Sequence, residues 1–469
     1  MNLDESLDQR VQELRSALPP HLAAGTGPVA VARAPGCLDV LGGAVRFAGG
    51  TWVSWPMRAG VTVAIRSVDG PALDLSSRGR ADRAQAERAV WPLADVEGIV
   101  DASGERALAE RLRADRTTAW SERVVLALRR IFRLVGRPLP GLAVDVRSDL
   151  PEGCGFGSST ALGAATARAA AAWLGLEGKG WIEEVAAVDR VGDPLAEPSD
   201  AFAVCDGVAG RFLPFLAQPC EPLDPIAPPP DVEPVALDLG GRVAAPPRLR
   251  TAAAMAYRIM AARMGLTVAT RERGEAQEVD DPFYGGWLAN CDPVTFTNEF
   301  RDALPERQAG EAFLDAYGGL ADAAVRVDPD VEYPVREAAG FVLTEHQRAC
   351  RFVDELHRTS GVEGASGESL GALLRASESE ARRLERVPRR AAELVDALDR
   401  RGPDRGVLGA RSTGPGGVVA LVRRGDASER ALQEAVAEWE RNCGRSATLL
   451  RGGSGGAAGA DAATVVTIP

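Results

Sequence analysis

The residues most suited to chemistry lie in the stretch LPEGCGFGSSTAL, residues 150–162, where three glycines and two serines are crowded together. They are Gly153, Gly155, Gly157, Ser158 and Ser159. Glycine adopts positive φ angles and lets backbone N–H groups approach a ligand closely. The Ala-rich run that follows predicts a helix, and a helix N-terminus adds partial positive charge and unpaired N–H groups. The stretch therefore predicts an anion site suited to phosphates.

The two serines leave more than one interpretation open. Ser158 and Ser159 can cap the helix, bind a phosphate or ligate Mg²⁺. The alternative to a phosphate site is a strand–turn–helix junction with a serine cap. The stretch is not the phosphate loop GxxxxGK[ST], because no lysine follows the glycines, and it is not GxGxxG in a Rossmann unit, because the preceding strands do not alternate with helices.

Two further stretches accompany the glycine-rich one. VARAPGCLDVLGG occupies residues 31–43, and GVLGARSTGPGGVVALV, residues 406–422, is a second glycine-rich turn that feeds a strand. The three stretches and their order resemble the GHMP small-molecule kinases, which carry an early APGR segment, a central PxxxGLGSS loop and a late glycine-rich loop. From this resemblance the chain is identified as a member of that family.

The resemblance favours one branch of the family. RAPGCLDVLGG is similar to RAPGRLDVMGG of the L-arabinokinase-like sugar kinases, and the segments YGGWLANCDP and LPERQAGEAFLDAYG also follow that group in order. The likeness runs from about residue 28 to the end. It implies an α+β fold with two domains, an N-terminal mixed sheet with helices and a C-terminal ferredoxin-like α+β sandwich.

The resemblance also implies roles for particular residues. ATP would bind with its phosphates on the segment 151–160, and Mg²⁺ on Ser159 and Asp189. Asp200, in GDPLAEPSDAFAVCDG, takes the place of the family's catalytic base. The alternative for both aspartates is a solvated surface acid or, for Asp200, a helix-start charge. The expected nucleotide contacts are Gly153, Gly155, Gly157, Ser158, Ser159, Thr413, Gly414 and Gly416, and the expected substrate contacts are Asp39, Arg46 and Gly414.

Several positions depart from the family pattern. Cys37 stands where the family carries an arginine that pairs with the catalytic acid and the transferring phosphate, and Arg46 stands where a sugar-binding aspartate belongs. Phe47 replaces a tyrosine, and Pro415 removes a backbone donor from a shortened late loop. Since a thiol cannot replace a cation, we expect slow turnover unless another arginine compensates. The arginines available in the motif segments are Arg33, Arg46 and Arg411.

Two functions therefore stay open. One is ATP-dependent phosphoryl transfer to a hydroxyl of a sugar or sugar-like metabolite, favoured by Asp200 and the intact GFGSS. The other is a catalytically weak or inactive homologue with a ligand-binding or regulatory role, favoured by Cys37, Arg46 and the shortened loop. An arginine in a sugar pocket would select a carboxylate or phosphate on the acceptor. The alternative is that Arg46 turns into solvent or pairs with a nearby acid.

The pattern of apolar residues predicts the elements that position these motifs. Strands are expected at 29–36, 51–57, 61–68, 142–151, 416–425 and 446–453, and helices at 121–136, 158–175, 249–265, 309–325, 335–358, 368–400 and 428–444. Residues 219–234 are proline-dense and are expected to hold neither helix nor central strand. The expected division is an N-terminal helix in 1–27, a domain at 28–218, a linker at 219–234 and a domain at 235–469.

Composition limits the function classes. The chain has 469 residues, 45% of them hydrophobic, and a net charge of −12, which argues against a general nucleic-acid binder. No apolar run is long enough to span a membrane. The start of the chain reads as an amphipathic helix with Leu7, Val11, Leu14 and Leu18 on one face, not as a signal peptide. Seven scattered cysteines are consistent with reduced thiols in the cytoplasm.

Overall fold

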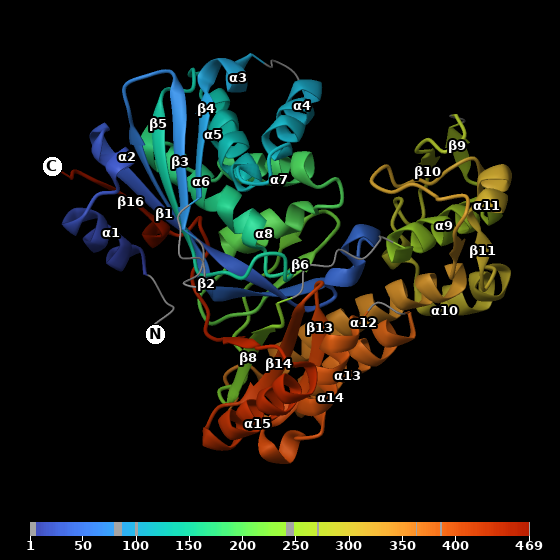
Figure 1. Ribbon diagram of the computed structural model, residues 1–469. Coiled ribbons are helices and arrows are strands. Elements are labelled where there is room, and N and C mark those ends of the chain that lie inside the picture. The colour runs from blue at the N-terminus through green and yellow to red at the C-terminus, as the bar shows by residue number, and fades with distance from the viewer. Residues whose placement is uncertain are drawn as a thin grey trace. The chain divides into compact units, whose positions relative to one another are not determined.

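The structure of the chain is a computed structural model (Figure 1). It describes residues 6–78, 87–98, 102–240, 248–269, 272–362, 364–384 and 387–468, so residues 1–5 of the expected N-terminal helix lie outside the described part. The chain forms two compact units: unit 1 is Met1–Leu38, Trp55–Leu213 and Leu449–Pro469, and unit 2 is Asp39–Ser54 and Pro214–Thr448. These units are not contiguous in sequence, whereas the sequence predicts one division, at residues 219–234.

Unit 1 is built on a mixed sheet with the strand order β16-β1-β2-β5-β3-β4. Its strands are β1 (Thr26–Leu41), β2 (Trp52–Ser67), β3 (Ala72–Arg78), β4 (Glu87–Pro92), β5 (Leu142–Ser148) and β16 (Ala463–Val466). The expected strands at 51–57 and 61–68 are one continuous strand, β2, because its side chains are buried along almost its whole length and Gly60 does not end it. β5 pairs antiparallel with β2 and parallel with β3.

Helices cover both faces of this sheet, as Figure 1 shows. On one side lie α3 (Leu93–Glu97), α4 (Ala102–Arg113), α5 (Glu122–Leu134), α6 (Ser158–Leu174), α7 (Trp181–Gly192) and α8 (Pro198–Asp206). The Ala-rich α6 is buried along most of its length and packs against α5, α7 and α8. Its small side chains allow these helices to approach closely. This packing brings together the first turn of α6, the C-terminal end of α7 and the first turn of α8.

The expected amphipathic N-terminal helix is present on the other side of the sheet. It is α1 (Leu7–Ser16), followed by α2 (Pro20–Ala23). Val11 and Leu14 are buried, and Leu7 and Leu18 pack against the same apolar cluster, which includes residues of β1, β2 and β5. The predicted apolar face is therefore confirmed for Leu7, Val11 and Leu14, whereas Leu18 lies beyond the end of α1 at Ser16, and α1 is a structural part of unit 1.

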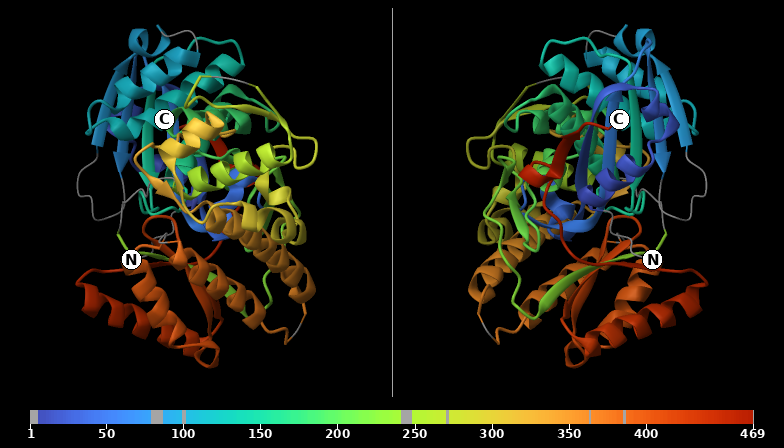
Figure 2. Two further views of the ribbon diagram at one scale, coloured as in Figure 1. Left: turned by 90° about the vertical axis from the view of Figure 1, so that its right-hand side faces the viewer. Right: turned by 90° about the vertical axis from the view of Figure 1, so that its left-hand side faces the viewer.

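Unit 2 contains a four-stranded sheet with the order β13-β14-β8-β15. Its strands are β8 (Val232–Asp238), β13 (Val407–Thr413), β14 (Gly417–Arg423) and β15 (Thr448–Leu450). Two antiparallel pairs, β13 with β14 and β14 with β8, and the helix α15 (Asp426–Cys443) between β14 and β15 give the connectivity of a ferredoxin-like sandwich. Figure 2 shows this layer of strands and helices, with β8 in green and β13, β14 and α15 in orange to red.

One expectation about the proline-dense stretch is wrong. Residues 219–234 contain the short β7 (Glu221–Pro222), which pairs with β6 (Leu213–Leu216), and the first residues of β8. Pro234 lies in β8 opposite Leu421, inside the sheet. Proline removes only its own N–H from the ladder, and burial of Val232, Val235 and Leu237 stabilises the strand despite that loss.

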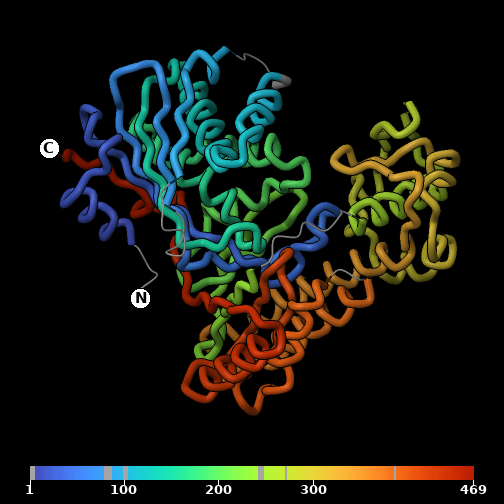
Figure 3. Tube along the Cα trace, viewed as in Figure 1, coloured from blue at the N-terminus to red at the C-terminus, as the bar shows by residue number. Residues whose placement is uncertain are grey.

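The remainder of unit 2 is mainly helical, and Figure 3 traces its path in yellow and orange. Its helices are α9 (Arg248–Arg263), α10 (Pro293–Thr295), α11 (Gly310–Tyr317), α12 (Val335–Thr359), α13 (Glu368–Arg383) and α14 (Arg389–Asp399), with short turns η1 (Gly43–Ala48) and η3 (Leu288–Asn290). The expected helix 309–325 ends at Tyr317, because Gly318 has a positive φ of 76°. The expected helix 368–400 is two helices.

Asp399, the last residue of α14, gives unit 2 a pH-dependent stability. Burial raises the pKa of its carboxyl from 3.8 to about 6, and Arg375 and Arg382 act in the opposite direction. At pH values between these two pKa values the folded chain binds more protons than the unfolded chain. The free energy of unfolding therefore falls as the pH rises from about 4 to about 6. We expect Asp399→Asn to raise the melting temperature by a few degrees at about pH 7.5 and to leave it unchanged near pH 4.

Thermal melting at both pH values measures this effect, with Asp396→Asn as the matched control on the same helix. Asp396 accepts a hydrogen bond from Arg382 at 2.7 Å, so its substitution is expected to lower stability at neutral pH instead. A gain in the Asp399→Asn variant that persists at pH 4, or no gain at pH 7.5, would contradict the burial argument.

Candidate active site

The glycine-rich loop of unit 1 connects β5 to α6. Gly153, Gly155 and Gly157 have φ angles of 72°, 88° and 70°, so the positive φ angles expected from the sequence are confirmed. Cys154 and Phe156 are 2% and 1% exposed, while Gly153 and Gly155 are exposed. The loop is therefore anchored by two buried side chains, and it presents glycine backbone at the surface between them.

The N-terminus of α6 follows this loop without a side-chain cap. Gly157, in a left-handed conformation, occupies the cap position, and no side chain accepts a hydrogen bond there. The serine-cap alternative is therefore wrong, because Ser158 and Ser159 lie inside the first turn and not at the cap. Ser159 is exposed and Ser158 is half-buried. An uncapped first turn beside exposed glycine backbone is the arrangement that favours an anion.

Cys37 of β1 lies directly against this loop. Its N–H donates to the carbonyl oxygen of Phe156 at 3.0 Å, and its side chain is 6% exposed. A Cβ atom added to Gly157 would lie 3.3 Å from the Cys37 nitrogen. The structure thus brings together the loop and the position at which the family pattern has an arginine.

Asp189, near the end of α7, has an unusual environment within unit 1. Its side chain is buried, and neither carboxylate oxygen has a hydrogen-bond partner of ordinary geometry in the described part of the chain. Burial raises the pKa of Asp189 to about 6; Arg123 and the hydroxyl of Thr160 lower it, and the charge of Asp200 raises it. Thr160 lies in the first turn of α6, next to Ser159, so Asp189 lies at the α6 N-terminus.

Arg123 holds the end of α7, although it belongs to none of the sequence motifs. Its Nη1 donates to the carbonyl oxygens of Val188 and Asp189 at 2.6 and 3.3 Å and lies 3.7 Å from Oδ1 of Asp189. A Cβ atom on Gly192 would lie 2.0 Å from this guanidinium, so a larger residue there would displace Arg123. Arg123 therefore positions the α7 terminus and is the cation that faces Asp189 among the described residues.

Asp200 occupies the first turn of α8, which begins at Pro198. It is half-buried, and its charge acts on Asp189. A carboxylate in the first turn of a helix interacts favourably with the helix dipole, so the helix-start role also fits this position. The two aspartates that the resemblance selected are thus close enough to interact, and one of them lies at the end of the glycine loop.

Asp39 of unit 2 is engaged by the protein itself. Its Oδ1 accepts hydrogen bonds from the N–H of Gly43 at 3.1 Å and from the indole Nε1 of Trp52 at 3.0 Å. Its Oδ2 lies 3.4 Å from Nη1 of Arg411, which also donates to the carbonyl oxygen of Val40. Asp39 therefore fixes the segment that carries Arg46, and this contact network within unit 2 was not foreseen.

Arg46 is held over the ring of Trp52. Its guanidinium carbon lies 4.2 Å from the ring centroid, and its Nε donates to the carbonyl oxygen of Gly43 at 3.2 Å. Trp52 is itself buried and stacks on Phe215 with ring centroids 5.1 Å apart. Neighbouring Phe47 has Arg250 over its ring. The guanidinium of Arg46 thus has fixed neighbours inside unit 2 and is not simply extended into solvent.

Arg411 is surrounded by acids. Burial lowers its pKa, but the charges of Asp39, Glu345 and Glu378 outweigh this effect and raise the pKa overall. Glu378 accepts hydrogen bonds from the N–H and the hydroxyl of Ser412 at 2.8 and 2.9 Å. Arg411 is therefore a permanently charged structural cation.

Arg33, in unit 1, likewise has a partner: its Nη2 lies 3.7 Å from Oδ2 of Asp149. Together with Arg411 and Arg46, it completes the set of three arginines considered as replacements for the cation missing at Cys37. Each of the three has a protein partner within its own unit.

The late glycine-rich stretch of unit 2 is a hairpin turn. β13 ends at Thr413 and β14 begins at Gly417 directly opposite, so Gly414, Pro415 and Gly416 form the turn. Gly414 has a φ of 57°, and the carbonyl oxygen of Gly416 accepts the N–H of Leu239. The buried hydroxyl of Thr413 has no hydrogen-bond partner among the described residues. The turn is short, as the sequence indicated.

The described residues contain no cluster of three or more histidine, cysteine, aspartate or glutamate side chains arranged to hold a metal ion. None of the described helices combines the length and the apolar character needed to cross a membrane.

A family model and a curated protein are both similar in sequence to this chain. Residues 122–207, from the start of α5 to the end of α8, match the family model of the GHMP kinases N terminal domain. L-arabinokinase of Arabidopsis thaliana is 25% identical over an alignment of 481 residues that covers 91% of this chain and 46% of that protein. The chain therefore spans about half the length of the curated relative that it matches.

Solved structures show the same fold. Lactococcus lactis galactokinase complexed with galactose has a TM-score of 0.69 and 15% identity, with 95% of this chain and 99% of that chain covered. Methanococcus jannaschii mevalonate kinase has a TM-score of 0.55 and 12% identity, with 90% and 98% covered. The α+β fold is thus that of the GHMP kinases. Residues 122–207 thus match the GHMP kinases N terminal domain, and the expected resemblance of the chain to the arabinokinase and galactokinase branch is confirmed.

Proposed function

We propose that the protein transfers a phosphoryl group from ATP to a hydroxyl of a sugar or sugar-like metabolite. The observation that carries this proposal is the arrangement in unit 1, where an uncapped helix N-terminus, exposed glycine backbone and a buried Asp189 without a hydrogen-bond partner of ordinary geometry lie together. Phosphoryl transfer depends on positioning and on neutralising charge, and these groups suit both tasks. The sugar-kinase relatives support the acceptor class.

The residues of unit 1 fit a nucleotide with Mg²⁺. The N–H groups of the loop and of the first turn of α6 would bind phosphate oxygens. Asp189 and the hydroxyl of Ser159 would hold Mg²⁺, which is usually bound by one or two carboxylates together with substrate phosphates and not by an all-protein cluster. Bound ATP would supply the phosphoryl group. Asp200 would take the proton of the acceptor hydroxyl, as a base near the attacking oxygen does.

The roles of unit 2 residues are part of the same proposal. Thr413, Gly414 and Gly416 would contact the nucleotide, and Arg46 with Asp39 and Gly414 the acceptor. Support for Thr413 is its buried hydroxyl without a partner among the described residues. The ordered guanidinium of Arg46 supports an acceptor that bears a carboxylate or phosphate, because an arginine held in place loses little freedom when it binds an anion.

The second function, a binding or regulatory homologue without appreciable turnover, is favoured by one observation. The three arginines that stand near the motif segments all have protein partners, so a cation to replace the one missing at Cys37 is not evident. Coupled-enzyme detection of ADP, with neutral sugars and the corresponding uronic acids as acceptors, separates the two functions. Nucleotide binding without ADP release would favour the homologue without turnover.

Gly155→Ala tests the nucleotide site. Gly155 is exposed and has a φ of 88°, so a methyl group there would strain the loop and stand beside its N–H groups. We expect the affinity for ATP with Mg²⁺ to fall at least about tenfold by calorimetry.

The matched control is Gly175→Ala at the other end of α6, where φ is 69° and the added methyl group meets nothing within 4 Å. This variant carries similar backbone strain, about 1–2 kcal/mol, and should keep its ATP affinity. If the wild-type protein binds no nucleotide, or if both variants lose affinity equally, the loop is not the phosphate site.

A further inference from the structure

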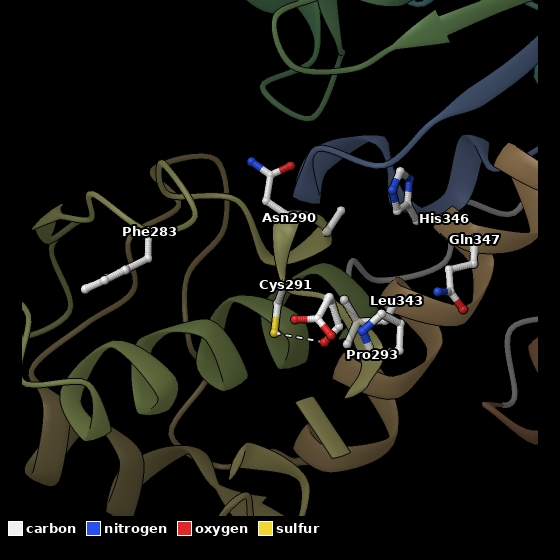
Figure 4. A pocket seen from close by; sticks show the side chains of 9 residues that line it. Phe283, Asn290, Cys291, Pro293, Leu343, His346 and Gln347 are labelled. Atoms are coloured by element: carbon white, nitrogen blue, oxygen red, sulfur yellow. Dashed lines mark hydrogen bonds between the residues drawn. The ribbon is translucent and has the colours of Figure 1, made fainter. Parts of the chain in front are cut away.

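Unit 2 contains a cavity of about 510 Å³ that none of the proposed kinase residues line. Its walls come from the loop at Phe283, from the turn 289–293 and from α12, at Leu343, His346 and Gln347 (Figure 4). This volume is within the range of small-molecule sites. Phe283 is 69% exposed, although phenylalanine is normally buried, and Figure 4 shows it at the edge of the cavity, apart from the other lining side chains.

Two polar groups of the wall, Asn290 and His346, are oriented by hydrogen bonds. Nδ2 of Asn290 donates to the carbonyl oxygen of Tyr284 at 2.9 Å, which fixes the amide plane and leaves Oδ1 as an acceptor. Nδ1 of His346 accepts the N–H of Thr51 at 2.9 Å. Burial lowers the pKa of His346, so the ring is neutral at neutral pH, and its single proton is on Nε2, which also lies 3.9 Å from Sγ of Cys350. The amide of Gln347 adds both a donor and an acceptor.

The charge of the wall discriminates between classes of ligand. None of the nine lining residues is a lysine or arginine. Hydrogen bonds from Thr295 and from the N–H of Val294 hold the pKa of Asp292 below its usual value, so this residue is a carboxylate at neutral pH. A single carboxylate and no cation disfavour nucleotides, sugar phosphates and uronic acids. What the wall offers is amide, imidazole and carboxylate hydrogen bonding beside an aromatic ring.

We propose that this cavity of unit 2 is a binding site for a neutral, hydroxyl-rich small molecule such as a monosaccharide. Sugar hydroxyls both donate and accept hydrogen bonds, which matches the amides of Asn290 and Gln347 and the donor at His346. The apolar C–H face of a sugar packs against an aromatic ring, which matches the exposed Phe283. The proposal goes beyond the kinase function and does not depend on it.

The test is calorimetric titration of the full-length chain without nucleotide, with D-galactose and L-arabinose as neutral probes. D-galacturonate and D-galactosamine serve as the acidic and basic counterparts of galactose. We expect a neutral sugar to bind, and Phe283→Ala and Gln347→Ala each to weaken its binding at least about tenfold. Val294→Ala, which shortens an equally exposed apolar side chain outside the wall, should leave the affinity unchanged.

Each other outcome overturns the proposal. Absence of binding by both neutral sugars, or equal affinity in the wild type and in the two wall variants, would show that the cavity is not a sugar site. Tighter binding of galacturonate or of galactosamine than of galactose would show that charge, not hydroxyl chemistry, determines the ligand. The two wall variants also separate this site from the kinase site, because Phe283 and Gln347 are not among the residues proposed to bind the nucleotide or the acceptor.

Discussion

Asp200→Asn is expected to lower the turnover of ATP-dependent phosphoryl transfer by about 10²–10⁴-fold, with little change in affinity for ATP and Mg²⁺. Asparagine keeps the size of aspartate and its ability to accept a hydrogen bond, but it cannot take the proton of the attacking hydroxyl, which is the contribution of a general base. The position of Asp200 in the first turn of α8, close enough to act on Asp189, supports this role. Steady-state ADP production and ATP calorimetry measure the two effects separately.

Asp206→Asn is the matched control. Asp206 ends the same helix, is also half-buried and pairs with Lys179, so the identical chemical change there should leave turnover within about twofold. If Asp200 were only a helix-start charge, its substitution would lower stability by about 0.3–1 kcal/mol and leave turnover intact. Thermal melting of both variants distinguishes that structural role from catalysis.

Local sequence patterns predicted the longest helices and some of the strands of this fold but not their limits, and they did not predict β3, β4, β8, β13, α4, α7 or α8. The run ERVVLALRRIFRL repeats at helical spacing, and it forms α5 within two residues of the expected bounds. Pro234, by contrast, lies in an interior strand because apolar burial on both sides of it outweighs one missing N–H, and that balance depends on tertiary contacts. The passage of residues 39–54 into unit 2 could not be predicted either, because it is set by long-range packing.

The candidate site was predictable where chemistry depends on residue type and chain order. Three glycines before an Ala-rich run indicated positive φ angles at a helix start, and the structure has them. The residues that position the site gave no such signal in the sequence. Arg123 acts on Asp189 only because α5 packs against α7. Glu378 reads as one more charge on a solvated helix face, yet it is buried and accepts both donors of Ser412.

Among the departures from the family pattern, Cys37 has the clearest expected effect on the turnover of phosphoryl transfer. Its side chain is buried against Gly157 of the glycine loop, and a neutral thiol there supplies no positive charge. Loss of one charged contact beside a transferring phosphate typically costs about 3–4 kcal/mol of transition-state stabilisation, or two to three decades in rate. We therefore expect the wild-type enzyme to be slow.

Cys37→Arg should accordingly raise turnover, because it restores a cation next to the loop. Arginine is also much larger than cysteine, and forcing it into a packed position costs about 1–3 kcal/mol of stability. Cys37→Met separates the two effects, since methionine brings a long unbranched side chain without charge. We expect the arginine variant to turn over ATP about 10²-fold faster than the methionine variant, with similar losses of melting temperature in both.

The comparison of these two variants also decides between two kinds of site. In a depleted site no group replaces the missing cation, and in a rebuilt site another group of the protein does. In a depleted site the missing charge limits the rate, so only arginine improves turnover, and the improvement requires an intact Asp200. In a rebuilt site the small thiol is needed for the loop to pack as it does, with the Cys37 N–H bonded to Phe156. Arginine and methionine would then be equally damaging, and the wild-type rate would match that of an ordinary sugar kinase. That result would show that the cation lost at this position has been replaced by another group of the protein.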